Sequence, residues 1–594
     1  MGKTNIKQNL LFIKRRLVLV KFFYFFITLI LVFRLFKLQI IDYFFYKKKS
    51  DNNYLRKKIL LPKRGIIFDR NMIKICDTKV NYKLLYFITK KEDINDIKNV
   101  YNLLNRDKKK IKSMLNIIEK KVNKNIGNFF VLAYDLSAEE IKRLKFNNVY
   151  FPKMRIENYY ARKYFFKNYT SALIGYISRD RSYQAIDFRN GSAGIEKIMD
   201  KSITGHVGLQ YNVINAAGKR VDKIIVDKPI DGADVITSID QDLQNELSRL
   251  FLDRNGAATL IDVRTGSVLA MVSSPSIDPN LMSSNISDEK WKEIIKSEFS
   301  SGLFTNKNIS SLYQPGSTFK IVTALTSIIK GIDPKKKYKC TGEYIVGNRI
   351  FRCHNKKGHG LIDLNTAIVK SCNCYFYDLS QQIGSKDICD TAKQLGLCDK
   401  HLQDFDNELS GFIGNSELFN KKYNKKWWSG DSANLSIGQG YVSLTPLQLA
   451  VMIARIATNK KVEPKYLFKN ESEKFISLGY NEKDLMIIRK ALYSSINNFK
   501  NNSFSEFVKK KYQICGKTGT AQVVSKKISL SDIKLKKVSV NQLSNAIFVG
   551  YAPFNDPRYA VSVVVEHGNS GAKSALPIGI QILSKAIDQE GKIN

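Results

Sequence analysis

Residues Tyr313 to Lys320 read YQPGSTFK and place a serine three residues before a lysine, directly after a Pro-Gly pair. Because Pro and Gly interrupt regular structure, Ser317 is predicted to open a helix that runs to Ile329, with Lys320 one turn further on the same face. The start of a helix favours developing negative charge, since its free N–H groups and its dipole both act there.

The spacing of Ser317 and Lys320 is weak evidence by itself, because the chain contains 96 lysines and arginines. Ser287 and Lys290, in SDEK, repeat the spacing without the Pro-Gly pair. A serine becomes a nucleophile only when a base takes its proton. A lysine is such a base only when burial or a second cation lowers its pKa. A catalytic role for Ser317 therefore requires another cation and further polar groups elsewhere in the chain.

Two later motifs supply these groups in order. SCN at Ser371 to Asn373 precedes the aromatic run YFYDL, and KTG at Lys517 to Gly519 lies in a predicted strand. Gly516 and Gly519 are expected to leave room for a substrate backbone beside that strand. The combination S-x-x-K, S-x-N and K-T-G is the signature of penicillin-binding proteins and serine β-lactamases. The three motifs together indicate that Ser317 is the nucleophile and Ser287 is not.

Predicted strands flank a mainly helical middle in the C-terminal part of the chain. NGAATLIDVRTGSVLAMVSSPS is predicted to form a hairpin that turns at Gly266, after an amphipathic helix in LQNELSRLF. Further strands are predicted in YQICGKTGTAQVV, AIFVGYAP and YAVSVVVEHG, and a last helix from Ile578. This arrangement indicates one sheet covered by helices.

Length and composition indicate a multidomain globular protein. A chain of 594 residues suggests two or three domains, and 44% hydrophobic residues exclude wholesale disorder. The formal net charge of +42 raises nucleic acid as a partner. The lysines are spread over every region, however, and no nucleic-acid-binding motif accompanies them. We therefore expect no nucleic-acid ligand and attribute the charge to composition and to attraction toward an anionic surface.

The N-terminal segment is predicted to anchor the chain in a membrane. LVLVKFFYFFITLILVF, Leu17 to Phe33, is apolar except for Lys21 and nearly long enough to cross a bilayer. No small-residue cleavage site follows, which favours an uncleaved anchor over a removed signal peptide. A buried core helix is the alternative. Basic residues flank the span on both sides, so the positive-inside rule gives no orientation.

Changes in composition suggest the domain boundaries. A solvated helix is expected over 107–124, and a cluster of Pro, Gly and Asp at Lys228 to Asp234 marks a boundary. The expected parts are a basic tail (1–16), a transmembrane anchor (17–40), a juxtamembrane linker (41–60) and two folded domains (61–230 and 235–594).

From about Arg64 to Pro577 the chain resembles the class B penicillin-binding proteins, which are membrane-anchored peptidoglycan transpeptidases. RGIIFDRN and GSAGIEKIMD resemble motifs of the family's pedestal, and LAMVSSPSIDPN resembles the strand region before its nucleophile. A β-lactamase or carboxypeptidase needs neither anchor nor pedestal. A class A protein needs a glycosyltransferase domain, for which no room or motif exists ahead of residue 235.

The resemblance implies a multidomain fold of the α+β and α/β classes. It consists of an N-terminal transmembrane helix, an extended α+β pedestal and a C-terminal, β-lactamase-like serine transpeptidase domain whose mainly antiparallel sheet is covered by helices. YQPGSTFK, WWSGDSANLSIGQGYVSLTPLQLA, GKTGTAQV and the GHG at Gly358 to Gly360 favour the elongation-specific subfamily, penicillin-binding protein 2, over the division-specific one.

The resemblance also implies the chemistry of acyl transfer. Lys320 would deprotonate Ser317, which attacks the penultimate D-alanine carbonyl of a D-Ala-D-Ala stem peptide. Ser371 would relay a proton to the departing D-alanine, and Asn373 would hold both the donor peptide and Lys320. Backbone N–H groups of Ser317 and Thr520 would hold the oxyanion. The expected substrate-binding residues are Lys517, Thr518, Gly519 and Thr520. The first two would bind the terminal carboxylate and bias the pKa of the cluster, and Lys517 is thereby also an expected catalytic residue.

Partners and location follow from the same resemblance. β-Lactams would mimic the donor and acylate Ser317. A SEDS-family glycan polymerase and rod-shape scaffold proteins are expected to meet the span and the pedestal. Because the substrate lies outside the cytoplasm, we expect a single-pass inner-membrane protein with a cytoplasmic N-terminus and a periplasmic catalytic domain. A division-specific transpeptidase and a catalytically impaired scaffold or β-lactam sensor are the alternatives.

Four residues between the first two motifs have the spacing of metal ligands, with C-x12-C, C-x5-H and H-x12-C. They are Cys340, Cys353, His359 and Cys372. Three thiolates and an imidazole suit a closed, tetrahedral structural zinc, and no organic cofactor is expected. Reduced structural cysteines and a Cys340–Cys353 disulfide in an oxidising compartment are the alternatives. As the middle residue of SCN, Cys372 is expected to point away from the cleft.

Overall fold

The computed structural model describes residues 3–90, 92–104, 129–166, 170–179, 189–215, 220–284, 288–296, 302–468, 474–497, 511–522 and 543–593. The helix expected over 107–124 and Ser287 lie outside these residues. The chain divides into two compact units. One contains Met1–Lys63 and Gly205–Asp231, and the other contains Arg64–Thr204 and Gly232–Asn594.

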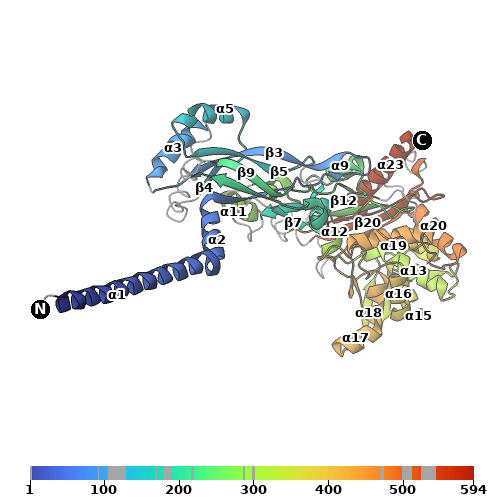
Figure 1. The fold of residues 1–594 in the computed structure, drawn as a ribbon. Coiled ribbons are helices and arrows are strands. Elements are labelled where there is room, and N and C mark those ends of the chain that lie inside the picture. The colour runs from blue at the N-terminus through green and yellow to red at the C-terminus, as the bar shows by residue number, and fades with distance from the viewer. Residues whose placement is uncertain are drawn as a thin grey trace. The chain divides into compact units, whose positions relative to one another are not determined.

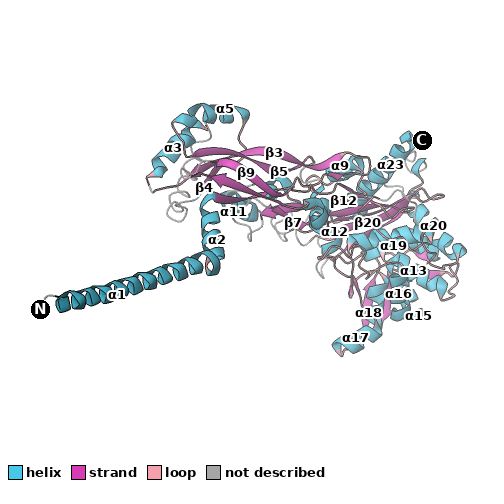
Figure 2. Cartoon of the chain, viewed as in Figure 1, coloured by secondary structure: helices cyan, strands magenta, loops and turns pink. Residues whose placement is uncertain are grey.

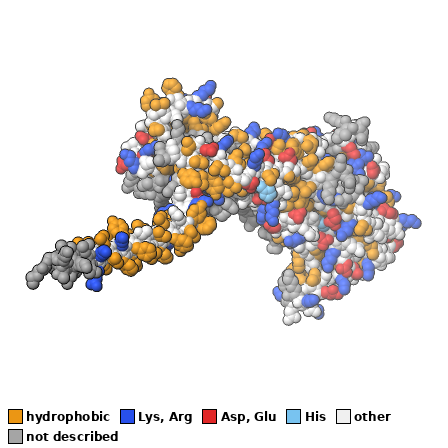
Figure 3. All heavy atoms as spheres, in the orientation of Figure 1, with side chains coloured by type: hydrophobic (Ala, Val, Ile, Leu, Met, Phe, Trp, Pro, Cys, Tyr) orange, Lys and Arg blue, Asp and Glu red, His pale blue; other side chains and the backbone are white. Residues whose placement is uncertain are grey.

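The first unit contains a long apolar helix and a small sheet. α1 (Lys3–Phe36) continues through a π-helical turn (Lys37–Ile41) into α2 (Tyr43–Tyr54). Within it, Ile13–Ile41 is long and apolar enough to cross a membrane, and none of this stretch is buried in protein. Figure 3 shows the apolar side chains along the described part of α1. The sheet has the antiparallel order β1 (Leu55–Leu60), β8 (Gly208–Ile214) and β9 (Arg220–Asp227).

The N-terminal part of the second unit is built around one long strand, β3 (Lys74–Phe87). It pairs antiparallel with β5 (Met154–Tyr164), β4 (Phe129–Ala133) and β2 (Ile67–Phe68), and β10 (Val235–Ile236) pairs parallel with β2. α3 (Asp93–Leu103) and α5 (Ala138–Phe146) pack a small apolar core against this sheet (Figure 1). The elements that follow are α6 (Ser171–Ile174), β6 (Tyr176–Arg179), β7 (Arg189–Ala193), α7 (Gly194–Ile198) and α8 (Asp200–Thr204).

A buried ion triad joins distant segments in this part of the unit. The carboxylate of Glu196, on α7, accepts hydrogen bonds from Arg64 at 2.8 Å and from Arg162, on β5, at 2.7 Å. Burial opposes the ionisation of Glu196, but the charges of Arg162 and Arg64 outweigh burial and lower its pKa. The triad therefore connects RGIIFDRN to GSAGIEKIMD, the two segments that resemble pedestal motifs.

The C-terminal part of the second unit contains the predicted antiparallel sheet covered by helices. Its strand order is β12 (Val268–Ser274), β11 (Gly256–Asp262), β21 (Tyr559–Val565), β20 (Asn545–Ala552) and β19 (Cys515–Ala521). The predicted hairpin is β11 and β12, and Gly266 in its turn has a φ of +76°. α9 (Gln241–Leu250) and α23 (Leu576–Ile593) form one apolar core with the sheet, and α19 (Pro446–Thr458) belongs to a second core.

Helices on one side of this sheet include those that carry Lys320 and Asn373 of the first two motifs (Figure 2). They are α13 (Lys320–Ile329), α14 (Leu364–Val369), α15 (Asn373–Gln382), α16 (Ser385–Gln394), α17 (Ser416–Tyr423), α18 (Ser429–Ser436) and α20 (Glu482–Asn497). Short strand pairs lie among them: β13 (Tyr338–Cys340) with β16 (Gly360–Ile362), β14 (Glu343–Val346) with β15 (Arg349–Arg352), and β17 (Phe412–Ile413) with β18 (Val442–Ser443). α10 (Pro279–Ser283), α11 (Asp288–Lys296) and α12 (Lys307–Ser310) precede the nucleophile motif.

Replacing Glu196 by glutamine is expected to lower the free energy of unfolding by about 3–5 kcal/mol, because two buried guanidinium groups would lose their counter-charge. Urea unfolding of the full-length protein in detergent measures this loss. Since the pKa of Glu196 is lowered in the folded protein, its ionised carboxylate stabilises above the ordinary value of about 4.3, and this contribution should fade as the pH falls below it.

The exposed pair of Lys386 and Glu417 is the control, with side chains 57% and 63% exposed. Glu417→Gln should change the free energy of unfolding by less than about 1 kcal/mol. Equal losses in the two variants would show that the triad adds no special stability.

Candidate functional site

Ser317 lies in a tight 3-10 turn (Gly316–Thr318), and α13 begins only at Lys320. The predicted helix from Ser317 to Ile329 is therefore present, with its first turn in the 3-10 form. Gly316, directly before Ser317, has a φ of +55°, a conformation that glycine adopts without strain. The N–H of Gly316 donates to the carbonyl of Gly438 at 2.9 Å, which fixes the entry of the turn.

The turn is packed tightly between Gly438 and β19. A Cβ on Gly438, whose φ is +71°, would lie 2.2 Å from the carbonyl oxygen of Gly316. A Cβ on Gly519 would lie 2.8 Å from the carbonyl oxygen of Pro315, and one on Gly516 would lie 2.6 Å from a carbonyl oxygen of β20. The expectation that Gly516 and Gly519 leave room for a substrate backbone is therefore wrong, because the protein itself fills that space.

Lys320 joins the first motif to the second. Its side chain is completely buried, and its Nζ lies 2.7 Å from the carbonyl oxygen of Ser371, 3.2 Å from Oγ of Ser371 and 2.7 Å from Oδ1 of Asn373. The hydroxyl of Ser317 makes no hydrogen bond to any other described residue. Catalytic hydrogen bonds are often long in a free enzyme and shorten only when substrate binds.

Lys320 and Lys517 differ in how far their surroundings lower the pKa of the side chain. Burial lowers the pKa of Lys320, and the nearby ammonium group of Lys517 contributes to a value of about 7. Burial lowers the pKa of Lys517 to about 8. At neutral pH a large fraction of Lys320 is therefore neutral and has a free lone pair, while most of Lys517 is cationic.

Ser371 has a strained backbone. Its φ of +54° lies in the left-handed region, which costs a residue other than glycine roughly 1–3 kcal/mol. This conformation directs both its carbonyl and its hydroxyl oxygen toward Lys320. The next residue, Cys372, is completely buried, whereas Ser371 and Asn373 line the cleft. Cys372 therefore lies behind the second motif, as the sequence predicts.

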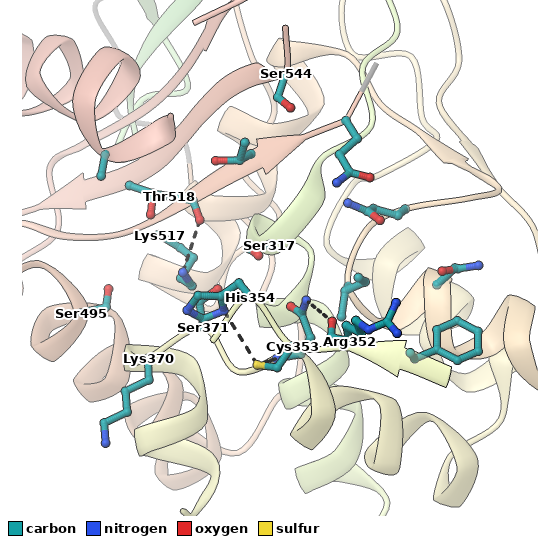
Figure 4. A pocket seen from close by; sticks show the side chains of 18 of the residues that line it. Ser317, Arg352, Cys353, His354, Lys370, Ser371, Ser495, Lys517, Thr518 and Ser544 are labelled. Atoms are coloured by element: carbon teal, nitrogen blue, oxygen red, sulfur yellow. Dashed lines mark hydrogen bonds between the residues drawn. The ribbon is translucent and has the colours of Figure 1, made fainter. Parts of the chain in front are cut away.

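All three motifs open onto one cleft of about 890 Å³. In Figure 4, Ser317, Ser371 and Lys517 lie around its centre, with Lys370 and Ser495 on one side and Arg352 on the other. Thr518 and Thr520 also line it, but Gly519 does not. Among the strands that the structure describes, β19 is the last of its sheet, so its outer edge has backbone groups that none of the other described strands of the sheet pairs with.

Several cleft residues escape the sequence analysis. They come from α18 and the loop after it, from α20, from the segment before α23 and from the chain around β15: Asn434, Gln439, Ser495, Asn569, Arg349, Arg352, His354 and Lys356. Asn434 and Gln439 belong to SANLSIGQG, which the sequence analysis uses only to choose a subfamily. The chain around β15 carries no motif that would have revealed its place in the cleft wall.

The four predicted metal ligands converge next to the second motif, and Cys353 among them also lines the cleft. Their ligand atoms all lie within 4.8 Å of one another. Nδ1 of His359 lies 3.7 Å from Sγ of Cys340 and 3.6 Å from Sγ of Cys353, which lies 3.9 Å from Sγ of Cys372. Ligand atoms around a tetrahedral zinc are roughly 3.5–3.8 Å apart, given the usual Zn–S and Zn–N distances. The donor set and its spacing therefore fit a zinc ion, and all eight cysteines are free thiols.

Comparisons with known families agree with this geometry. The penicillin binding protein transpeptidase domain matches residues 256–584, and the penicillin-binding protein dimerisation domain matches residues 59–237. The peptidoglycan D,D-transpeptidase MrdA of Acinetobacter baumannii is 30% identical over 93% of this chain and 84% of the relative. The protein of the same name from Escherichia coli K12 is 23% identical over 92% of this chain and 90% of the relative.

Solved structures give the same fold. Penicillin-binding protein 2 (PBP2) of Helicobacter pylori, solved in complex with MreC, has a TM-score of 0.74 at 24% identity and covers 91% of this chain and 100% of its own. PBP2 of Pseudomonas aeruginosa, solved in complex with WCK 5153, has a TM-score of 0.64 at 26% identity and covers 89% and 96%. The chain therefore belongs to the class B penicillin-binding proteins, and among them it is most like penicillin-binding protein 2.

Proposed function

We propose that the protein is a membrane-anchored peptidoglycan D,D-transpeptidase that cross-links stem peptides during cell elongation. The observation that carries this proposal is the buried contact of Lys320 with Ser371 and Asn373, beside a cleft that Ser317 and Lys517 line. The MrdA relatives, named peptidoglycan D,D-transpeptidases, support the same activity. A catalytically impaired scaffold or β-lactam sensor is disfavoured, because every motif residue is present.

Acylation begins when the neutral Nζ of Lys320 takes the proton of Ser317. Oγ of Ser317 then forms a bond to the carbonyl carbon of the penultimate D-alanine, and the carbonyl oxygen becomes an oxyanion. Backbone N–H groups of Ser317 and Thr520 stabilise the oxyanion, at about 3 kcal/mol per donor. When the intermediate collapses, the C–N bond breaks, and the proton passes from Lys320 through Ser371 to the departing D-alanine.

The donor peptide is held by charge and by backbone pairing. Lys517 and Thr518 bind its terminal carboxylate, since most of Lys517 is cationic at neutral pH. The free edge of β19 offers backbone groups to an extended peptide. Asn373 binds the peptide with its amide nitrogen while Oδ1 accepts from Lys320. Gly519 acts indirectly, because its missing side chain lets β19 approach the nucleophile turn.

Deacylation uses the same groups in reverse order. The amine of a neighbouring stem peptide attacks the ester carbon, and its proton passes through Ser371 to Lys320 and then to Oγ of Ser317. Water in place of that amine gives carboxypeptidase-like hydrolysis.

The substrate sets the proposed topology. Among the described residues one helix, Ile13–Ile41, is both long and apolar enough to cross a membrane, which supports a single-pass anchor in the inner membrane. Because stem peptides are cross-linked outside the cytoplasm, the N-terminus is cytoplasmic and the catalytic domain periplasmic. The proposed partners are a SEDS-family glycan polymerase and rod-shape scaffold proteins. PBP2 of Helicobacter pylori was solved in complex with MreC, which supports a protein partner of the second kind.

We also propose a structural zinc in the cluster of Cys340, Cys353, His359 and Cys372. Four protein ligands leave no open position, so the ion supplies rigidity and no hydrolytic chemistry. The backbone N–H of Asn373 donates to Sγ of Cys353 at 3.4 Å. The ligand set therefore supports the backbone of the second motif from behind, and it affects the reaction only through the position of that motif.

Labelled penicillin should acylate the full-length protein once, at Ser317. Ser317→Ala should abolish labelling, and Lys320→Ala should slow it by about 10²–10⁴-fold, because an unassisted hydroxyl keeps its proton at neutral pH. The labelling rate should rise with pH up to about 7, where Lys320 becomes neutral. Mass spectrometry of the labelled peptide identifies the serine.

Ser287→Ala is the control, because this serine shares the spacing to a lysine but lacks the other motifs. It should label like the parent protein. A label on any serine other than Ser317 would refute the assignment of the site.

Depletion of the protein in its native organism should turn rod-shaped cells into round ones, because lateral wall growth would stop while division continues. Light microscopy after depletion measures the change in shape. Filamentous cells would instead indicate the division-specific role.

Full-length protein purified without added metal should contain about one zinc per chain by elemental analysis. Cys340→Ser and His359→Ala should both lose the metal, unfold at lower temperature and acylate more slowly, still at Ser317, because metal binding also stabilises the fold. A metal-free parent protein with a Cys340–Cys353 disulfide would overturn the zinc proposal.

A further inference from the structure

A carboxylate outside the catalytic cleft connects the nucleophile motif to the sheet. Glu566 directly follows β21, and its Oε1 accepts a hydrogen bond from the hydroxyl of Tyr313 at 2.7 Å. Its other oxygen, Oε2, pairs with Nζ of Lys307 at 2.6 Å. The same Nζ donates to the carbonyl of Ser274, the last residue of β12, at 2.9 Å. One carboxylate thus links the ends of two strands to the first residue of YQPGSTFK.

Lys307 and Tyr313 are buried, whereas the Glu566 side chain is 20% exposed and lines, with both of them, a second pocket of about 340 Å³. Lys307 is 5% exposed and Tyr313 is 7% exposed. Burial and the charge of Glu566 raise the pKa of Tyr313, so its hydroxyl keeps its proton and acts as the donor. Hydrogen bonds to a charged carboxylate are shorter and stronger than neutral ones. The Tyr313–Glu566 contact is therefore a firm attachment point for the chain that leads into the turn.

The chain between Tyr313 and Ser317 has little freedom to absorb a displacement. The backbone of Tyr313 exchanges two hydrogen bonds with Leu444, both of 2.9 Å. Pro315 fixes its own φ, and Gly316 is bonded to Gly438 and crowded by it. A displacement of the Tyr313 backbone would therefore be passed on to Ser317.

None of these three side chains touches the catalytic cleft. Tyr313, Lys307 and Glu566 are absent from the described residues that line it, whereas Ser317, Ser371 and Lys517 all belong to that lining. Any effect of the three on acyl transfer must run through the position of the nucleophile.

We propose that Glu566 and Tyr313 are positioning residues that set the distance of Oγ of Ser317 from Lys320 and from the donor carbonyl. This inference rests on the proposed function, because it takes Ser317 as the nucleophile. Misplacing a reacting group by about 1 Å costs on the order of 10²-fold in rate, so loss of one contact that fixes the turn should be measurable.

The opposite end of β21 provides a matched control. Tyr559, the first residue of that strand, donates its hydroxyl to Oε2 of Glu590 at 3.0 Å, and Arg558 pairs with Glu590 at 2.7 Å. Tyr559 is 6% exposed and does not line the cleft. Tyr313→Phe and Tyr559→Phe therefore each remove one tyrosine hydroxyl that donates a hydrogen bond to a carboxylate. In both places a cation also pairs with that carboxylate.

The test compares these two variants as full-length protein in detergent, with labelled penicillin as the probe. Stopped reactions over a range of penicillin concentrations separate the maximal acylation rate from the half-saturating concentration. Thermal unfolding reports the structural cost. Both variants should unfold at similarly reduced temperatures. Only Tyr313→Phe should lower the maximal rate, by about tenfold, and it should change the half-saturating concentration by less than about twofold. Glu566→Gln should resemble Tyr313→Phe.

The remaining outcomes distinguish failure of the positioning role from failure of the proposed function. Equal maximal rates in Tyr313→Phe and Tyr559→Phe would overturn the positioning role and leave Ser317 as the nucleophile. A change confined to the half-saturating concentration would overturn it as well. Failure of the parent protein to label at Ser317 would overturn the proposed function, and the positioning role with it.

Discussion

The buried ammonium group of Lys320 is the constraint on which the catalytic part of the molecule depends. Burying a lysine beside a second cation is costly, and the cost is tolerable only because oxygen atoms of Ser371 and Asn373 surround it. Ser371 makes its two contacts with Lys320 from a left-handed backbone conformation. The second motif must therefore be held from behind, where the Cys and His side chains converge. The sheet in turn supplies Lys517, on β19, to the lining of the same cleft.

Much of this arrangement was predictable because residue type and order are sufficient to suggest it. A serine and lysine one turn apart, a second serine with an asparagine, and a lysine in a strand define complementary chemical roles before any coordinates are known. Alternating and continuous apolar runs likewise indicate the β11–β12 hairpin and the later strands, since their burial follows directly from the sheet. The four metal-ligand candidates were also predictable, because their residue types suit few other purposes at that spacing.

The remainder depends on contacts that no local pattern contains. Gly519 indicates that another group lies close to its backbone, but the sequence does not say whether this group belongs to the substrate or to the protein. In the structure it is the carbonyl oxygen of Pro315. The first turn of the nucleophile helix is 3-10 rather than α, and Gly316 before it has a positive φ, which a Pro-Gly pair permits without requiring it. Tyr313 and Glu566 are far apart in the chain, and only the folded sheet brings them within 2.7 Å. The cleft wall near Arg349 carries no motif at all.

The crowding of glycines around Ser317 also bears on how the protein can evolve. A side chain on Gly438 or Gly519 would collide with the backbone of the nucleophile turn, so neither position can accept another residue without moving Ser317. The short strand β15 is different, because Arg349, Ile350 and Arg352 are exposed at the cleft wall. Substitutions at that wall therefore change how inhibitors or peptides fit without moving the nucleophile turn.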